Sequence, residues 1–141
     1  MISRQHWLGV AMAGLGCWLL TEACQPDVPH IYMSVQDYRI VPRRVHIHRT
    51  GPFKLIMTNE GREPHYIVST LLTHPNTAME QSSGNSPQVD KRGVRLLPGQ
   101  RAAFLVHVPP GLYRFRCVIP GHRGMWSMVL VDTREGPSAK R

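Results

Sequence analysis

The sequence predicts an all-β protein, a two-sheet Greek-key sandwich of seven or eight strands with one long polar insertion. Three observations support this fold class. Short apolar runs recur from His30 onward, and turns rich in Pro and Gly separate them. Apolar and polar residues alternate within several of these runs, as they do in half-buried strands. No segment after residue 24 has apolar residues at the spacing of a helix. We therefore expect the apolar faces of the strands to be buried by packing one sheet against another.

The amino terminus has the composition of an export signal. Arg4 precedes an uncharged apolar run over residues 7–20, which is shorter than a membrane-spanning helix. We therefore expect residues 1–23 to be a signal peptide that directs the protein to the bacterial periplasm or to the outer face of the cytoplasmic membrane. The Ala23-Cys24 pair is similar to a lipoprotein cleavage site, which predicts a lipid tether on Cys24. Simple cleavage near Ala23 is the alternative.

The length of 141 residues fits a single domain. We expect a linker over residues 24–29, the folded domain over 30–132 and a disordered tail over 133–141. The segment 73–92 is polar and has no clear period, so we interpret it as a mobile insertion. A short amphipathic helix over 78–82 is the alternative there.

The expected strands are short and closely spaced, which favours antiparallel pairing. In the strand over residues 44–48, Val45 and Ile47 are expected to face the core while His46 and His48 face water. Two histidines at this spacing are able to chelate a surface metal, but no third donor is near in sequence, so a plain polar face is favoured. All the expected strands are residues 30–35, 44–48, 53–58, 66–72, 94–97, 102–108, 112–117 and 128–131.

The most informative stretch is the loop that follows the strand over residues 112–117. Cys117, His122 and Met125 supply a thiolate, an imidazole and a thioether through spacers too short for a helix. These are donors of a blue-copper electron-transfer centre, which needs one more imidazole. His65 is the candidate, because it ends a polar turn between two apolar runs. Met128 is the rival axial donor, but it would begin the closing strand, so Met125 is preferred.

Two motifs together resemble the cupredoxin family. An N-x-G-x-x-x-H turn lies at residues 59–65, and a Cys-loop-His-loop-Met segment lies at 117–125, in the order that cupredoxins have. The C-x-x-P-G-H part is similar to the azurin and auracyanin loop, and the H-x-x-M spacing is similar to that of amicyanin. The resemblance covers residues 30–132 and implies a cupredoxin fold, one type 1 copper ion and a one-electron carrier. It also implies that His122 is the port through which electrons pass.

The chain is strongly basic, with 17 Lys and Arg residues, 9 Asp and Glu residues and a formal net charge of +8. Loss of residues 1–23 would remove one charge of each sign and leave this net charge unchanged. A net charge of this size influences which partners a protein binds, but it carries no information about the fold. The chain is expected to be exported and has no nucleic-acid recognition motif, which argues against nucleic acid as the partner. We therefore expect an acidic redox partner, such as a c-type cytochrome or a terminal oxidase. Arg62 and Arg123 are close in sequence to His65 and His122, so we expect them to rim the docking surface.

Other copper functions fit the sequence less well. A copper-handling protein, which delivers or buffers copper for an oxidase, favours exposed Met and His donors, and the chain has no Met-rich run. A copper enzyme such as a nitrite reductase requires further His ligands and a second domain. The binuclear copper domain of cytochrome oxidase needs two loop cysteines, and residues 117–125 contain one. We therefore predict a non-catalytic carrier in the cell envelope, with no small-molecule substrate.

Overall fold

A computed structural model describes residues 27–48, 51–80 and 86–133 of the chain. The predicted signal peptide, the Cys24 site and all but the first residue of the predicted tail lie outside these residues. Within the described part, no helix is long and apolar enough to cross a membrane.

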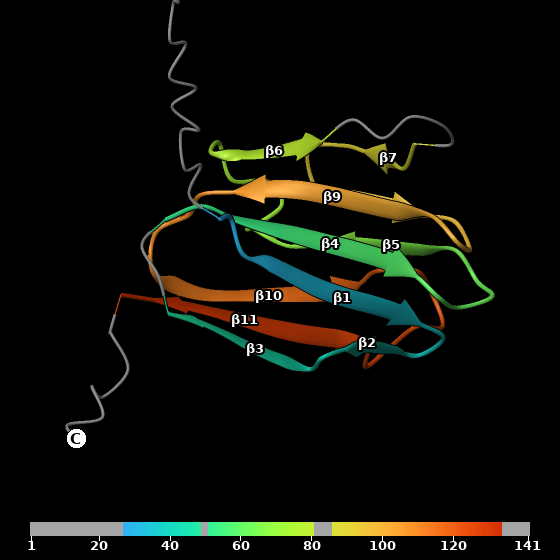
Figure 1. Ribbon diagram of the computed structural model, residues 1–141. Coiled ribbons are helices and arrows are strands. Elements are labelled where there is room, and N and C mark those ends of the chain that lie inside the picture. The colour runs from blue at the N-terminus through green and yellow to red at the C-terminus, as the bar shows by residue number, and fades with distance from the viewer. Residues whose placement is uncertain (1–26, 49–50, 81–85, 134–141) are drawn as a thin grey trace, which may run out of the picture.

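The described residues form two mixed β-sheets that pack face to face (Figure 1). Their strands are β1 (His30–Gln36), β2 (Arg39–Val41), β3 (Arg44–His48), β4 (Phe53–Asn59), β5 (His65–Val68), β6 (Thr77–Glu80), β7 (Gln88–Val89), β8 (Gly93–Leu96), β9 (Arg101–Val106), β10 (Gly111–Cys117) and β11 (Trp126–Asp132). The first sheet has the order β2-β1-β4-β9-β6, and the second has the order β3-β11-β10-β5-β8-β7. The predicted all-β sandwich is confirmed. The described residues form eleven strands, whereas seven or eight were expected. The difference is the three short edge strands β2, β6 and β7.

The polar segment 73–92 contains β6 and β7, so the expectation of an insertion without strands, or of a helix over 78–82, is wrong for these parts. β6 pairs antiparallel with β9, from Thr77 opposite Val106 to Glu80 opposite Ala103. The segment has little strand propensity of its own. Pairing nevertheless satisfies backbone groups along the edge of β9, and this tertiary contact overrides the local preference.

The strand that was expected over residues 66–72 ends at Val68. Ser69 turns the chain there, because its Oγ accepts a hydrogen bond from the Leu71 amide at 3.3 Å and its carbonyl accepts one from the Leu72 amide at 3.1 Å. Local hydrogen bonds of this kind compete with strand pairing. Leu71 and Leu72 are nevertheless buried, so their apolar character reflects core packing and not a continued strand.

Two of the nine described strand pairings are parallel, β1 with β4 and β3 with β11, whereas the strand spacing predicted antiparallel pairing. β2 ends at Val41, and the chain then crosses to the second sheet and forms β3 from Arg44. It then returns to the first sheet as β4, beside β1. Parallel neighbours need a crossing connection of this kind, and strand spacing alone does not show which strands the crossing will join.

The core lies between the two sheets and contains the inward side chains of both. Phe53 and Phe104 from the first sheet and Phe115 from the second are each 1% exposed or less. Burial of one such side chain stabilises the fold by about 1.5–3 kcal/mol. On β3 the alternation is as predicted, since Ile47 is buried while His46 and His48 are exposed.

Candidate metal centre

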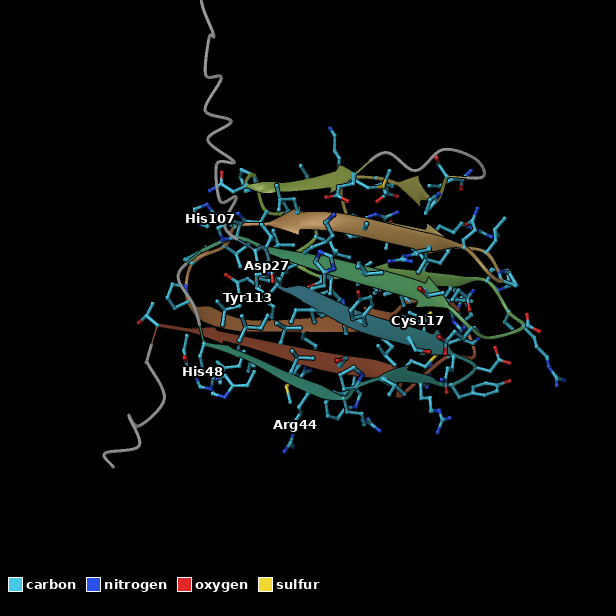
Figure 2. All side chains as sticks on the ribbon, viewed as in Figure 1. Asp27, Arg44, His48, His107, Tyr113 and Cys117 are labelled. Atoms are coloured by element: carbon cyan, nitrogen blue, oxygen red, sulfur yellow. The ribbon has the colours of Figure 1, made fainter. Side chains whose placement is uncertain are left out.

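Two adjacent strands place the first two side chains of the candidate centre. β5 and β10 pair antiparallel, with Cys117 opposite Ile67. His65 precedes Ile67 by two residues, so both face the interior from β5, and both are buried. Cys117 ends β10 on the face that carries the buried Phe115, so its side chain also points inward. His65 and Cys117 therefore enter the same end of the core, and Figure 2 shows Cys117 at that end.

The turn that carries His65 is held by Asn59, which has no exposed surface. The side-chain amide of Asn59 donates to the Glu63 carbonyl at 2.9 Å and to the Leu96 carbonyl at 3.0 Å. Its side-chain oxygen accepts a hydrogen bond from the Gly61 amide at 2.9 Å. One side chain thus satisfies three backbone groups and ties the turn to β8, which is why an Asn begins this motif.

Asp37, in the turn between β1 and β2, supports the same turn from outside. Its Oδ1 accepts hydrogen bonds from the Arg62 amide at 2.9 Å and from the Glu63 amide at 3.3 Å. A Cβ added to Gly61 would clash with this Oδ1 and would lie 2.9 Å from the Asp37 backbone nitrogen. The glycine of the motif therefore allows a close approach that any larger residue would block.

The loop from Cys117 to Met125 consists of two consecutive tight turns. The His122 amide donates to the Ile119 carbonyl at 3.1 Å, and the Met125 amide donates to the His122 carbonyl at 3.3 Å. The Cys117 amide then donates to the Met125 carbonyl at 3.2 Å and closes the loop. The third residue of each turn has a φ of 89°, as type II turns require, and is a glycine: Gly121 and Gly124. The short spacers thus place His122 and Met125 back at the end of β10.

His65, Cys117 and His122 bring three donor atoms together. The Nδ1 atoms of the two histidines are 3.2 Å apart, and Cys117 Sγ lies 3.8 Å from His65 Nδ1 and 3.5 Å from His122 Nδ1. A metal ion with bonds of about 2.0 Å to nitrogen and about 2.3 Å to sulfur holds such atoms about 3.3–3.6 Å apart in tetrahedral geometry. The three interatomic distances bracket this range, so the three side chains fit one ion.

The three donor residues are buried, with exposed fractions of 0% for His65, 8% for His122 and 9% for Cys117. Burial lowers the pKa of His65, and the neighbouring His122 lowers it further, while the Asp37 carboxylate opposes the shift. This lowering of the pKa favours the neutral imidazole, which is the form that binds a metal. Cys117 is a free thiol and is available as a thiolate donor.

The second ring nitrogen of His65, Nε2, is buried without a hydrogen-bond partner. The nearest acidic atom, Asp37 Oδ1, lies at 3.7 Å, which is an ion-pair distance but too long for a hydrogen bond. Metal-binding histidines generally direct their second nitrogen towards a carboxylate or a carbonyl. The orientation of His65 towards Asp37 agrees with that pattern, and Nδ1 is left to face the other donors.

Met125 and Met128 differ in the face that they occupy. Met125 is 2% exposed and belongs to the core at the end of the ligand loop. Met128 lies in β11 between the buried residues Ser127 and Val129, so its side chain points to the opposite, outer face of the sheet. Met125 is therefore on the same side of the sheet as Cys117, and Met128 is not.

Tyr38 covers the edge of His122 and was missed by the sequence analysis, as was Asp37. The two rings pack edge to face, with centroids 5.7 Å apart and an interplanar angle of 71°. Tyr38 is 67% exposed and has a φ of 66°, which is uncommon for a residue other than glycine. No sequence signal identifies Tyr38 or Asp37, because both come from a hairpin turn on the other sheet.

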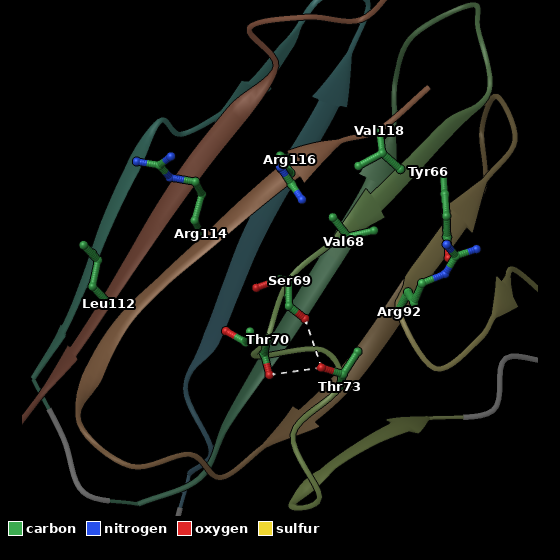
Figure 3. Close-up of a pocket in the computed structure, with 10 residues that line it drawn as sticks. All are labelled: Tyr66, Val68, Ser69, Thr70, Thr73, Arg92, Leu112, Arg114, Arg116 and Val118. Atoms are coloured by element: carbon green, nitrogen blue, oxygen red, sulfur yellow. Dashed lines mark hydrogen bonds between the residues drawn. The ribbon is translucent and has the colours of Figure 1, made fainter. Parts of the chain in front are cut away.

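Basic side chains occur on two surfaces near the centre. Arg62 and Arg123, predicted to rim the docking surface, are both exposed, one in the turn before His65 and one in the ligand loop. A shallow groove of about 550 Å³ lies on the outer face of β5 and β10 (Figure 3). Its lining includes three arginines, to which the sequence analysis assigned no role: Arg92, Arg114 and Arg116.

The comparisons with known proteins agree with the fold. No family model and no curated protein sequence matches the chain. A dithionite-reduced auracyanin from the photosynthetic bacterium Roseiflexus castenholzii has a TM-score of 0.51 and 17% sequence identity, over 73% of this chain and 96% of that chain. Auracyanin B has a TM-score of 0.51 and 16% identity, over 75% of this chain and 91% of that chain. The chain therefore has the fold of the auracyanins, a cupredoxin fold, as its two motifs predicted.

Proposed function

We propose that the chain is a mononuclear type 1 copper protein that carries one electron at a time between redox partners in the cell envelope. The observation that carries this proposal is the convergence of His65 Nδ1, Cys117 Sγ and His122 Nδ1 within a buried site. Met125, buried at the end of the same loop, is the proposed weak axial donor. Copper bound by this donor set would supply reversible one-electron oxidation and reduction.

The surrounding structure suits a carrier because it holds the donors in place. Asn59 holds the turn before His65, and paired turns hold His122 and Met125. A site that suits both oxidation states with little rearrangement favours fast electron transfer. Burial of the donors also favours a carrier over an enzyme, because it keeps substrates away. The alternative, a copper-handling protein for an oxidase, needs exchangeable donors, and burial favours retention of the ion.

The first test is the visible spectrum of the copper-loaded protein. With Cu(II) bound, the Cys117 thiolate is expected to give an intense visible band, and Cys117→Ser should abolish it. Cys117→Ser removes one sulfur atom from the site and leaves both imidazoles, so the variant tests the thiolate itself. A wild-type protein that takes up Cu(II) without colour would contradict the proposal.

We further propose that an acidic redox protein, such as a c-type cytochrome or a terminal oxidase, docks near His122. The formal net charge of +8 and the exposed positions of Arg62 and Arg123 support this surface. Tyr38 is exposed beside His122 and adds an aromatic contact there. Complementary charge of this kind raises the association rate and loses its effect as salt is added.

The docking surface can be tested with two variants that change the charge equally. Arg62→Glu with Arg123→Glu should slow electron transfer from an acidic cytochrome at low salt, and added salt should reduce the difference. Arg114→Glu with Arg116→Glu is the matched control, because both residues are exposed on β10 and line the groove instead. If the control pair slows the reaction and the first pair does not, docking occurs at the groove.

We also propose that residues 1–23 direct export and that Cys24 carries a lipid tether. The apolar run over residues 7–20 and the Ala23-Cys24 pair support this location. In a bacterial host, the wild-type protein should fractionate with membranes and Cys24→Ser should be released as a soluble periplasmic protein. Equal amounts of both proteins in the soluble periplasmic fraction would show that simple cleavage occurs.

A further inference from the structure

β3 is an edge strand of the second sheet and carries two histidines on its outer face. One residue separates His46 from His48, so both side chains point away from the core. Each histidine side chain is 45% exposed, and the two ring centroids are 3.7 Å apart. Two imidazoles in this arrangement need a third donor to form a specific metal site.

The third donor comes from β11, the parallel neighbour of β3. Asp132 lies directly opposite His48 in the strand register. Asp132 Oδ2 is 2.6 Å from His46 Nε2, and Asp132 Oδ1 is 2.9 Å from His48 Nδ1. The carboxylate therefore lies between the two imidazoles and contacts both. This third donor is not apparent in the sequence, because Asp132 is 84 residues from His48 along the chain.

This cluster is separate from the candidate copper centre. Asp132 ends β11, whereas the ligand loop enters the same strand at Trp126, and six strand residues span about 20 Å. Figure 2 shows His48 and Cys117 at opposite ends of the sandwich. The two sites share no residue, so the following inference does not rest on the proposed electron-carrier function.

We propose that His46, His48 and Asp132 form a second metal site, which takes a divalent transition-metal ion, with Cu(II) the most tightly bound. The donors are two imidazole nitrogens and carboxylate oxygen without a thiolate, a set that suits tetragonal Cu(II) or Ni(II) and also Zn(II). Bonds of about 2.0–2.1 Å at right angles place neighbouring donors about 2.9 Å apart. The two nitrogen–oxygen distances, 2.6 and 2.9 Å, are close to this value.

Several features indicate a site that is largely assembled before the ion arrives. The parallel pairing of β3 and β11 sets the relative positions of all three residues, from His46 opposite Leu130 to His48 opposite Asp132. The donor atoms all lie within 4.8 Å of one another. The histidines are exposed, so water can complete the coordination and the ion can enter directly from solvent. Among divalent ions of the first transition row, Cu(II) binds such sites most tightly.

The test is titration of the full chain with Cu(II), followed by calorimetry and electron paramagnetic resonance. The wild-type protein should bind a second equivalent of Cu(II). The electron paramagnetic resonance signal of this ion should be tetragonal and should show hyperfine coupling to nitrogen. His46→Ala with His48→Ala should lose this equivalent and its signal. Asp132→Asn should weaken Cu(II) binding at this site by at least about tenfold. Loss of a residue that only hydrogen-bonds to a metal ligand already lowers metal affinity by about that factor. His107→Ala, which removes another exposed histidine on the described surface, is the matched control and should leave binding unchanged.

The Cys117→Ser variant separates this proposal from the proposed function, because it removes the thiolate centre and retains His46, His48 and Asp132. It should still bind the tetragonal ion, and addition of the two histidine substitutions should abolish that binding. Far-UV circular dichroism verifies that each variant is folded, and Asp132→Asn provides the milder change if the double substitution unfolds the chain. The proposal is overturned if wild type shows no tetragonal signal, if the signal survives both histidine substitutions, or if Asp132→Asn leaves the affinity unchanged.

Discussion

Replacement of Asn59 tests whether one buried side chain holds the turn that presents His65. Asn59→Ala removes the hydrogen bonds to the Glu63 and Leu96 carbonyls and the bond from the Gly61 amide. A hydrogen bond contributes about 1 kcal/mol net, and a buried group left without a partner costs about 1–3 kcal/mol. Three lost bonds predict a decrease of about 3–5 kcal/mol in the free energy of unfolding. Two of the bonds are only partly buried, so we expect a value of about 3 kcal/mol, at the lower end.

Asn59→Asp distinguishes the hydrogen bonds from simple loss of volume. The carboxylate retains an acceptor for the Gly61 amide but replaces the amide donor by an oxygen that faces two carbonyl oxygens. It also places a charge at a position with no exposed surface. The Asp variant should therefore be at least as destabilised as the Ala variant, although its volume is close to that of the wild-type side chain.

Urea unfolding of the metal-free protein, followed by circular dichroism, measures these changes. The matched control is Asn76→Ala, because Asn76 is exposed and its hydrogen bonds run through its backbone amide and carbonyl. That substitution should change the free energy of unfolding by less than about 0.5 kcal/mol. A loss below about 1 kcal/mol for Asn59→Ala, or an Asp variant more stable than the Ala variant, would refute the role given to Asn59.

The axial donor and the acid stability give two further predictions. Met125→Leu should retain copper and raise the reduction potential, because loss of the sulfur donor destabilises Cu(II) more than Cu(I), whereas Met128→Leu should leave the potential unchanged. A potential that responds only to Met128→Leu would reverse this assignment. The Tyr66 hydroxyl donates to Asp90 and lowers the pKa of that carboxyl below its ordinary value of 3.8. A carboxyl whose pKa is lower in the folded state than in the unfolded state stabilises the fold at neutral pH, and this stabilisation is lost as the pH falls through the folded-state pKa. Asp90→Asn should therefore lower the free energy of unfolding at neutral pH and change it little in strong acid. Urea midpoints at both pH values test this, and an equal loss at each pH would contradict it.

The sequence alone determined the local features of this protein. Alternation predicted the inward face of β3, because the two-residue period of a strand depends only on neighbouring residues. The spacing of Cys117, His122 and Met125 predicted that one short loop carries all three donors, and the Pro and Gly residues of that loop form the turns that return the chain to β10. The residues at 59–65 predicted the turn before His65 for the same reason, since Asn59 and Gly61 act on backbone groups within it.

Only the tertiary structure decided which distant segments meet. β6 forms because β9 offers an edge, although the sequence of residues 77–80 shows no strand period. Asp37 and Tyr38 reach His65 and His122 only because the two sheets pack face to face. Asp132 joins His46 and His48 because β11 pairs with β3 in one parallel register. Each of these contacts joins residues far apart in the chain, and such contacts depend on the packing of all the strands together, which no local pattern of residues contains.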